Sequence, residues 1–162
     1  MALNRNWFAN LRGADRAMVD RRERVLEVLD RRYLRESQHV TRFREHAERI
    51  ADAHIRETLL RIAAGEAEHV HWLEEKILTL GGKPPAVAAI HSNHENAQGY
   101  LRSDLDEERR CVAEIEADKK NLQAEFPDIV ALLDRIETDA ANHGQEIRAL
   151  LQGDADLVLW AR

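Results

Sequence analysis

The chain has 162 residues, with 44% hydrophobic, 33% charged and 5% aromatic residues, and a formal net charge of −6 at pH 7. This length fits a single domain (1–162), the few glycines, prolines and aromatics favour an all-α protein, and the acidic balance argues against nucleic-acid partners. One cysteine excludes an internal disulfide framework, and the N-terminus lacks a signal-peptide layout, so we expect a cytoplasmic protein. No apolar run approaches the roughly 18 residues of a membrane span, so we expect no membrane partners.

Apolar residues recur at steps of three and four residues along four segments, which is the pattern of amphipathic helices. A short N-terminal segment, 1–14, precedes the first helix, and a break at 51–54 separates it from the second. Gly153 is expected to stop the last helix, leaving a tail at 154–162. The predicted helices run from about 15 to 50, about 55 to 80, about 97 to 126 and 127 to 153.

The connection between the second and third helices is the longest in the predicted fold. Gly81 and Gly82 end the second helix, and the segment 83–96 carries two prolines and scattered polar residues. It is too long for a tight helical hairpin, whereas the other two connections are short. The elements therefore predict an antiparallel four-helix bundle with one long crossover between helices two and three. Plain bundles and helical adaptor domains share this pattern, so the side chains must decide the function.

Five ionisable residues fall on the stripes that should face the core. The second helix carries a Glu-x-x-His pair, which places both side chains on one face about one turn apart. The fourth helix repeats this layout with Ala140 in place of the carboxylate. The five residues are Glu36, Glu66, His69, Glu108 and His143.

A carboxylate in an apolar core is costly unless it is paired, protonated or bound to a cation. No Lys or Arg lies on the inferred core stripes, whereas two histidines do. Carboxylate and imidazole together suit iron, manganese or zinc. The pattern therefore predicts a metal site in the bundle core.

The same stretches resemble a known family. The second helix and the turn after it resemble those of bacterioferritins, in the stretch Glu66-Ala-Glu-His69, continued by Val-His-Trp-Leu-Glu-Glu-Lys-Ile and Leu-Gly-Gly-Lys-Pro. The third helix resembles theirs in Leu101-Arg-Ser-Asp-Leu105 followed by Glu108. Glu36-Ser-Gln is similar to the first helix of rubrerythrins. The resemblance covers roughly residues 25–151 and implies the ferritin-like fold.

The resemblance also implies roles for the five residues. Glu36 and Glu108 would be terminal carboxylates, Glu66 a bridging one, and His69 and His143 the paired imidazoles. Sites of this family hold two irons, which oxygen or peroxide oxidises. We therefore expect metal ions with oxygen or peroxide as partners, and a homo-oligomer that is at least a dimer.

Several positions depart from the family pattern. Ala140 replaces the second bridging Glu, so only five of six expected ligands are present. Asp139 and His39 are the candidates for an extra ligand, although a solvated surface position is expected for both. Ala67 replaces the haem-ligating Met of bacterioferritins, so no haem is expected. Cys111 is expected to be a small buried residue without a role. The remaining histidines considered are expected at the surface: His54, His71, His91 and His94.

Two functions stay open on these grounds. The first is a ferritin-like metalloprotein that binds one or two iron ions, or manganese or zinc, with ferroxidase-like or peroxidase-like activity that the missing carboxylate weakens. The second is a non-enzymatic interaction or structural protein that keeps the fold and has lost the metal chemistry. Ala140 is the strongest argument for the second.

Overall fold

A computed structural model describes residues 5–88, 90–91, 93–122 and 125–160, with side chains described from residue 16 to residue 153 outside these gaps. Every regular element in the described ranges is a helix. The four helices are α1 (Arg5–Arg49), α2 (Ala53–Thr79), α3 (Ala97–Leu122) and α4 (Pro127–Trp160).

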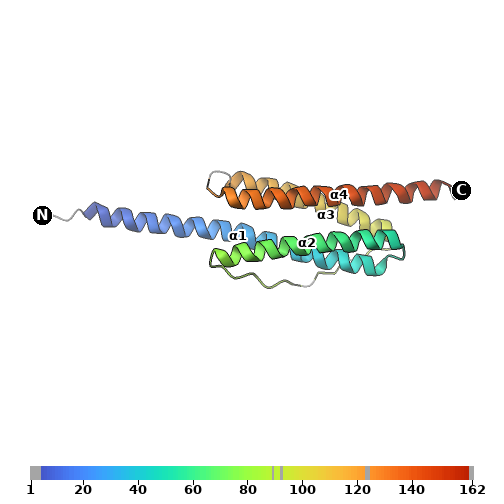
Figure 1. Cartoon of the computed structure of the whole chain (residues 1–162), viewed down its shortest axis with the longest axis horizontal. Helices are drawn as coiled ribbons and strands as arrows, with labels where there is room; N and C mark the ends of the chain where they lie inside the picture. The colour runs from blue at the N-terminus through green and yellow to red at the C-terminus, as the bar shows by residue number, and fades with distance from the viewer. Residues whose placement is uncertain (1–4, 89, 92, 123–124, 161–162) are drawn as a thin grey trace.

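The helices form two antiparallel pairs, α1 with α2 and α3 with α4, which pack into one bundle (Figure 1). The connection that follows α2 runs back along the bundle to the start of α3. Asp52 caps α2 by accepting a hydrogen bond from the backbone of Ile55 at 2.9 Å. Gly81, at a φ of 70°, ends α2 in the left-handed region that favours glycine. The antiparallel bundle with one long crossover is therefore confirmed.

The apolar core consists of two clusters, one towards each end of the bundle. One cluster includes Leu29 of α1 and Leu133 of α4, and the other includes Phe43 of α1 and Ile147 of α4. On each helix, the predicted ionisable residues fall in the stretch of sequence between its contributions to the two clusters. The bundle thus carries a polar layer in the middle of an otherwise apolar interior.

Helix ends differ from the predicted ones at three places. α1 begins at Arg5, inside the segment 1–14 that was expected to precede it, and α3 ends at Leu122 rather than near 126. The predicted stop at Gly153 is wrong, because α4 continues to Trp160 through most of the expected tail. A single glycine costs a helix only about 1 kcal/mol, which does not force an end. Both α1 and α4 extend past the other helices, at opposite ends (Figure 1).

Candidate metal centre

The most compact part of the polar layer joins α1 and α2. Glu36 reaches across from α1, and Glu66 and His69 share one face of α2 because they are three residues apart. Nδ1 of His69 lies 3.2 Å from a carboxylate oxygen of Glu36 and 3.2 Å from one of Glu66. All three side chains are about 1% exposed, and their ligand atoms lie within 4.8 Å of one another. These three residues can hold a metal ion.

Glu66 connects this group to the second helix pair. Its Oε1 lies 2.9 Å from Nδ1 of His143 in α4, while its Oε2 faces His69. Nδ1 of His143 is also 3.9 Å from an oxygen of Glu108 in α3. The five predicted ligands therefore come together around Glu66, with the two oxygens of that residue facing different neighbours.

His39 is also part of this layer, and the expectation that it lies at the surface is wrong. It is 1% exposed, and its ligand atom lies within 4.8 Å of those of Glu66 and Glu108. Its nearest carboxylate oxygens, on Glu66 and Glu107, are 3.9 Å away. The cause is helical geometry: three residues after Glu36, the side chain of His39 follows it into the core.

Asp139 is partly exposed, as expected, and it also contacts the site. Its side chain is 39% exposed, as a position at the helix edge predicts, but Oδ2 lies 3.2 Å from Nε2 of His69. Ala140, the next residue, is buried at 2% and contributes no ligand. Asp139 therefore contacts the outer nitrogen of a candidate ligand, an arrangement that orients metal-bound histidines in proteins.

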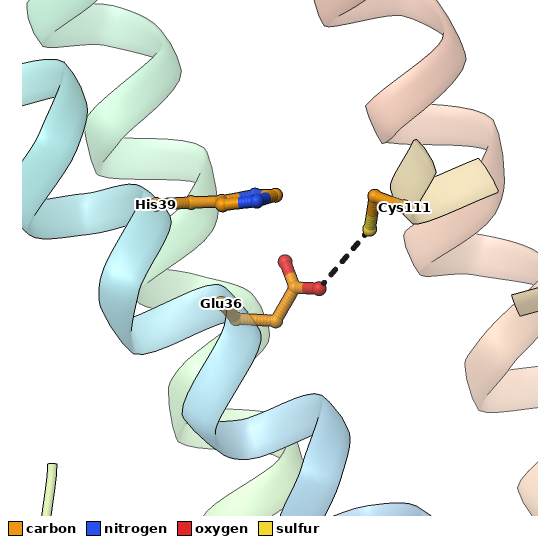
Figure 2. Close-up of side chains that lie close together, drawn as sticks. All are labelled: Glu36, His39 and Cys111. Carbon is orange, nitrogen blue, oxygen red and sulfur yellow. Dashed lines mark hydrogen bonds between the residues drawn. The ribbon is translucent and has the colours of Figure 1, made fainter. Parts of the chain in front are cut away.

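Cys111 is buried, as expected, and it also contacts the site. Its thiol donates to Oε1 of Glu36 at 3.5 Å (Figure 2). On its other side, the guanidinium of Arg32 lies 4.0 Å from the sulfur.

Arg32 contradicts the expectation that no basic residue occupies the core. It is fully buried, donates to Glu114 at 2.5 Å and pairs with Asp118 at 3.2 Å. Its long side chain starts on the stripe between Leu29 and Glu36, and the acids of α3 neutralise its charge. The prediction failed because the partners of Arg32 lie on a helix far away in the sequence.

Burial and mutual repulsion favour protonation of the groups in this candidate site. Burial, followed by repulsion from Glu66, raises the pKa of Glu36 to about 7. Burial, again with repulsion from Glu66, also raises the pKa of Glu108 well above its ordinary value. Burial opposes a charged His69, but its hydrogen bonds to Glu36 and Glu66 outweigh this and raise its pKa to about 10. A cation bound there must therefore displace protons at neutral pH.

A second buried polar pair was missed by the sequence reasoning. Nδ1 of His46 lies 2.8 Å from an oxygen of Asp104, and both side chains are fully buried. The ring of His46 also packs against Tyr100 at a centroid distance of 4.6 Å. His46 lies ten residues after Glu36, so continuing the helical stripe of α1 would have found it.

The other histidines fit the surface expectation less uniformly. His54, His71 and His91 are exposed, as predicted. His94 is partly buried and packs edge-on against the ring of Tyr100 at 5.0 Å. It therefore helps to fix the crossover onto α3.

No protein-family model and no curated protein matches the sequence. Within the described part of the chain, no helix is long and apolar enough to cross a bilayer. Solved structures do resemble the fold of this chain. A ferritin-like diiron-carboxylate protein of Bacillus anthracis has a TM-score of 0.70 at 22% identity, over 81% of this chain and 97% of its own.

Two further structures extend the likeness. Bacterioferritin of Desulfovibrio desulfuricans, which has a diiron site, aligns with a TM-score of 0.76 at 19% identity, over 85% of this chain and 84% of its own. The bacterioferritin-related dodecameric thioferritin of Bacteroides fragilis aligns with a TM-score of 0.77 at 13% identity, over 84% of this chain and 89% of its own. These likenesses confirm that the chain has the ferritin-like four-helix bundle fold.

Proposed function

We propose that the chain is a metalloprotein that binds iron, as one or two ions, at Glu36, Glu66, His69, Glu108 and His143. The observation that carries this proposal is the state of Glu108. It is 1% exposed, and neither of its carboxylate oxygens has a hydrogen-bond partner among the described residues. Buried polar groups are nearly always paired, so two unpaired oxygens on one carboxyl group favour a cation as the missing partner.

The remaining residues divide into two overlapping positions. Glu36, Glu66 and His69 form the first. Glu108 and His143 lie on the other side of Glu66, where we expect the second ion. His39 would supply a ligand to this second position in place of the carboxylate that Ala140 lacks, since it groups with Glu66 and Glu108.

Iron is favoured over manganese and zinc because two of the structural neighbours are diiron proteins. Carboxylates and imidazoles also suit manganese and zinc, so the donor set alone does not choose. Iron in such a site supplies electron transfer to oxygen or peroxide. The chain's own residues would hold the ions apart from bulk water, orient His69 through Asp139, and release protons from Glu36 and His69 as ions enter. We expect the protein to work in the cytoplasm as an oligomer, at least a dimer.

The test is anaerobic titration of the metal-free protein with ferrous iron, followed by oxygen. We expect saturation at one or two ions per chain and a ferric absorbance band after oxygen is added. His39→Phe should remove the second ion and leave the first. Saturation without a ferric band would confine the protein to metal binding, and no saturable binding would refute the proposal.

Ala140 supports an alternative function, that of an interaction or structural protein. A bundle that has lost one carboxylate ligand fits an interaction or structural protein without metal chemistry. In that case, the melting temperature should be the same with and without iron, manganese or zinc, since only a ligand that binds the folded state stabilises it. A rise with any of these metals would contradict the alternative.

A further inference from the structure

A thiol lies against the candidate iron site on the side away from His69. Figure 2 shows Glu36 and His39 on neighbouring turns of α1, facing the space towards Cys111 of α3. The sulfur lies 3.5 Å from Oε1 of Glu36, whereas Oε2 of Glu36 lies 3.2 Å from His69. Glu36 therefore offers one oxygen to each side.

The three residues have the positions that a metal site requires. Their ligand atoms, one each from Glu36, His39 and Cys111, lie within 4.8 Å of one another, and each residue is about 1% exposed. Carboxylate oxygen, imidazole nitrogen and sulfur make up the usual ligand set of protein-bound zinc.

His39 gives the second, independent observation. Within the described residues, neither of its ring nitrogens has a hydrogen-bond partner, although the ring is buried. A buried imidazole normally finds a partner for each nitrogen. A cation between His39, Glu36 and Cys111 would provide one.

We propose that Glu36, His39 and Cys111 form a zinc site in which Cys111 binds as a thiolate. This zinc site shares Glu36 with the proposed iron site, and it depends on the proposed function only through that shared residue. Three protein ligands leave a fourth tetrahedral place for water. Sulfur is a soft ligand, so this position favours zinc over a hard cation such as magnesium or calcium. The buried Arg32, 4.0 Å from the sulfur, offsets the negative charge of the metal-bound thiolate.

His39 belongs to both this position and the group with Glu66 and Glu108. A neutral imidazole has one unprotonated nitrogen, so His39 can bind a metal ion in only one of the two sets at a time. Zinc bound beside Cys111 should therefore compete with the second iron ion, so that the zinc-loaded protein binds one ferrous ion fewer per chain than the metal-free protein.

Cobalt(II) is the suitable probe, because it takes zinc positions and its bond to sulfur gives a charge-transfer band in the near ultraviolet. The chain has one cysteine, so any such band from an isolated chain reports Cys111. We expect the band to saturate at one cobalt per chain, to scale linearly with protein concentration, and to disappear in Cys111→Ser. Glu68→Ala, at an exposed position on α2, should keep it.

The outcomes separate the two proposals. Cobalt binding without a sulfur band, or a band that grows faster than the protein concentration, would overturn the thiolate position and leave the iron site standing. No cobalt, zinc or iron binding at all would overturn both. If Cys111→Ser does not fold by circular dichroism, the wild-type spectrum and the His39→Phe variant, which should also lose the band, still decide the matter.

Discussion

Oδ2 of Asp139 lies 3.2 Å from Nε2 of His69, on the opposite side of the imidazole from Glu36 and Glu66. This contact fixes which ring nitrogen is available inside the bundle. With Nε2 directed at the Asp139 carboxylate, Nδ1 faces Glu36 and Glu66, where a metal ion would bind, and the ring cannot turn without losing the contact with Asp139. We therefore expect Asp139, which lies next to Ala140, to position His69 for metal binding.

Replacing Asp139 should weaken metal binding without removing a ligand. We expect Asp139→Ala to lower the affinity for the first ion about 10- to 100-fold, the usual effect of losing a carboxylate that orients a metal-bound histidine. Competition titration with a chromophoric chelator measures this. Asp134→Ala is the matched control, because Asp134 lies on the same helix and pairs with Lys119 at the surface. Equal affinities in the two variants would contradict the role of Asp139.

Metal affinity should rise with pH. The pKa of His69 is raised to about 10 and that of Glu36 to about 7, so an ion entering the first position displaces a proton from His69 and, below pH 7, a second from Glu36. Each displaced proton makes the apparent affinity about tenfold higher per pH unit. Titrations between about pH 6 and pH 8 should show this increase, with a steeper slope on the acid side. An affinity that is flat or falls over this range would contradict proton displacement.

The metal-free protein should show the matching change in stability. The folded pKa of Glu36, about 7, is raised above the ordinary value of 4.5. Its contribution to stability is therefore full below pH 4.5 and is lost as the pH rises through about 7. Glu36→Gln should remove this loss, which urea unfolding at several pH values measures. An unchanged pH dependence in the variant would exclude Glu36 as its source.

Two glycines beside the site predict opposite effects of an added methyl group. A Cβ on Gly65 would lie 3.3 Å from Nε2 of His143, which must shift, whereas on Gly144 it would make ordinary contacts at 3.7 Å with Glu108 and Leu105. Gly144→Ala should therefore stabilise the fold by about 0.5–1 kcal/mol with unchanged metal affinity. Gly65→Ala should reduce binding of the second ion. Thermal unfolding and metal titration of both variants provide the test, and unimpaired binding in Gly65→Ala would contradict the expectation that the added methyl group displaces His143 from the second ion.

The two arginines that pair with Asp118 should differ in their effect on stability. Arg32 is fully buried, whereas the side chain of Arg31 is 52% exposed. Breaking a buried pair costs 3–5 kcal/mol, and we expect about 3 kcal/mol for Arg32→Met because Asp118 keeps Arg31. Arg31→Met should cost less than about 1 kcal/mol. The free energy of unfolding in urea measures both, and equal costs would contradict this difference.

Helical periodicity was enough to predict the fold and the central residues. The stripes placed Glu36, Glu66 and Glu108 inside the bundle, where the structure has them. Periodicity of a single helix does not say which neighbour a long side chain meets. The burial of Arg32 depends on acids of α3, and the contact of Asp139 depends on α2, so both needed the tertiary structure. His39 was expected at the surface, although its position three residues after Glu36 places both side chains on the same face of the helix.

The most direct measurement is the metal content of the protein purified without chelators. We expect at least one iron, manganese or zinc ion per chain, and a fall to background in Glu66→Ala, since Glu66 contacts both His69 and His143. Glu68→Ala, an exposed neighbour on the same helix, should keep the wild-type content. Metal-free wild-type protein that also fails to take up added iron, manganese or zinc would contradict the proposal that a cation neutralises the buried acids.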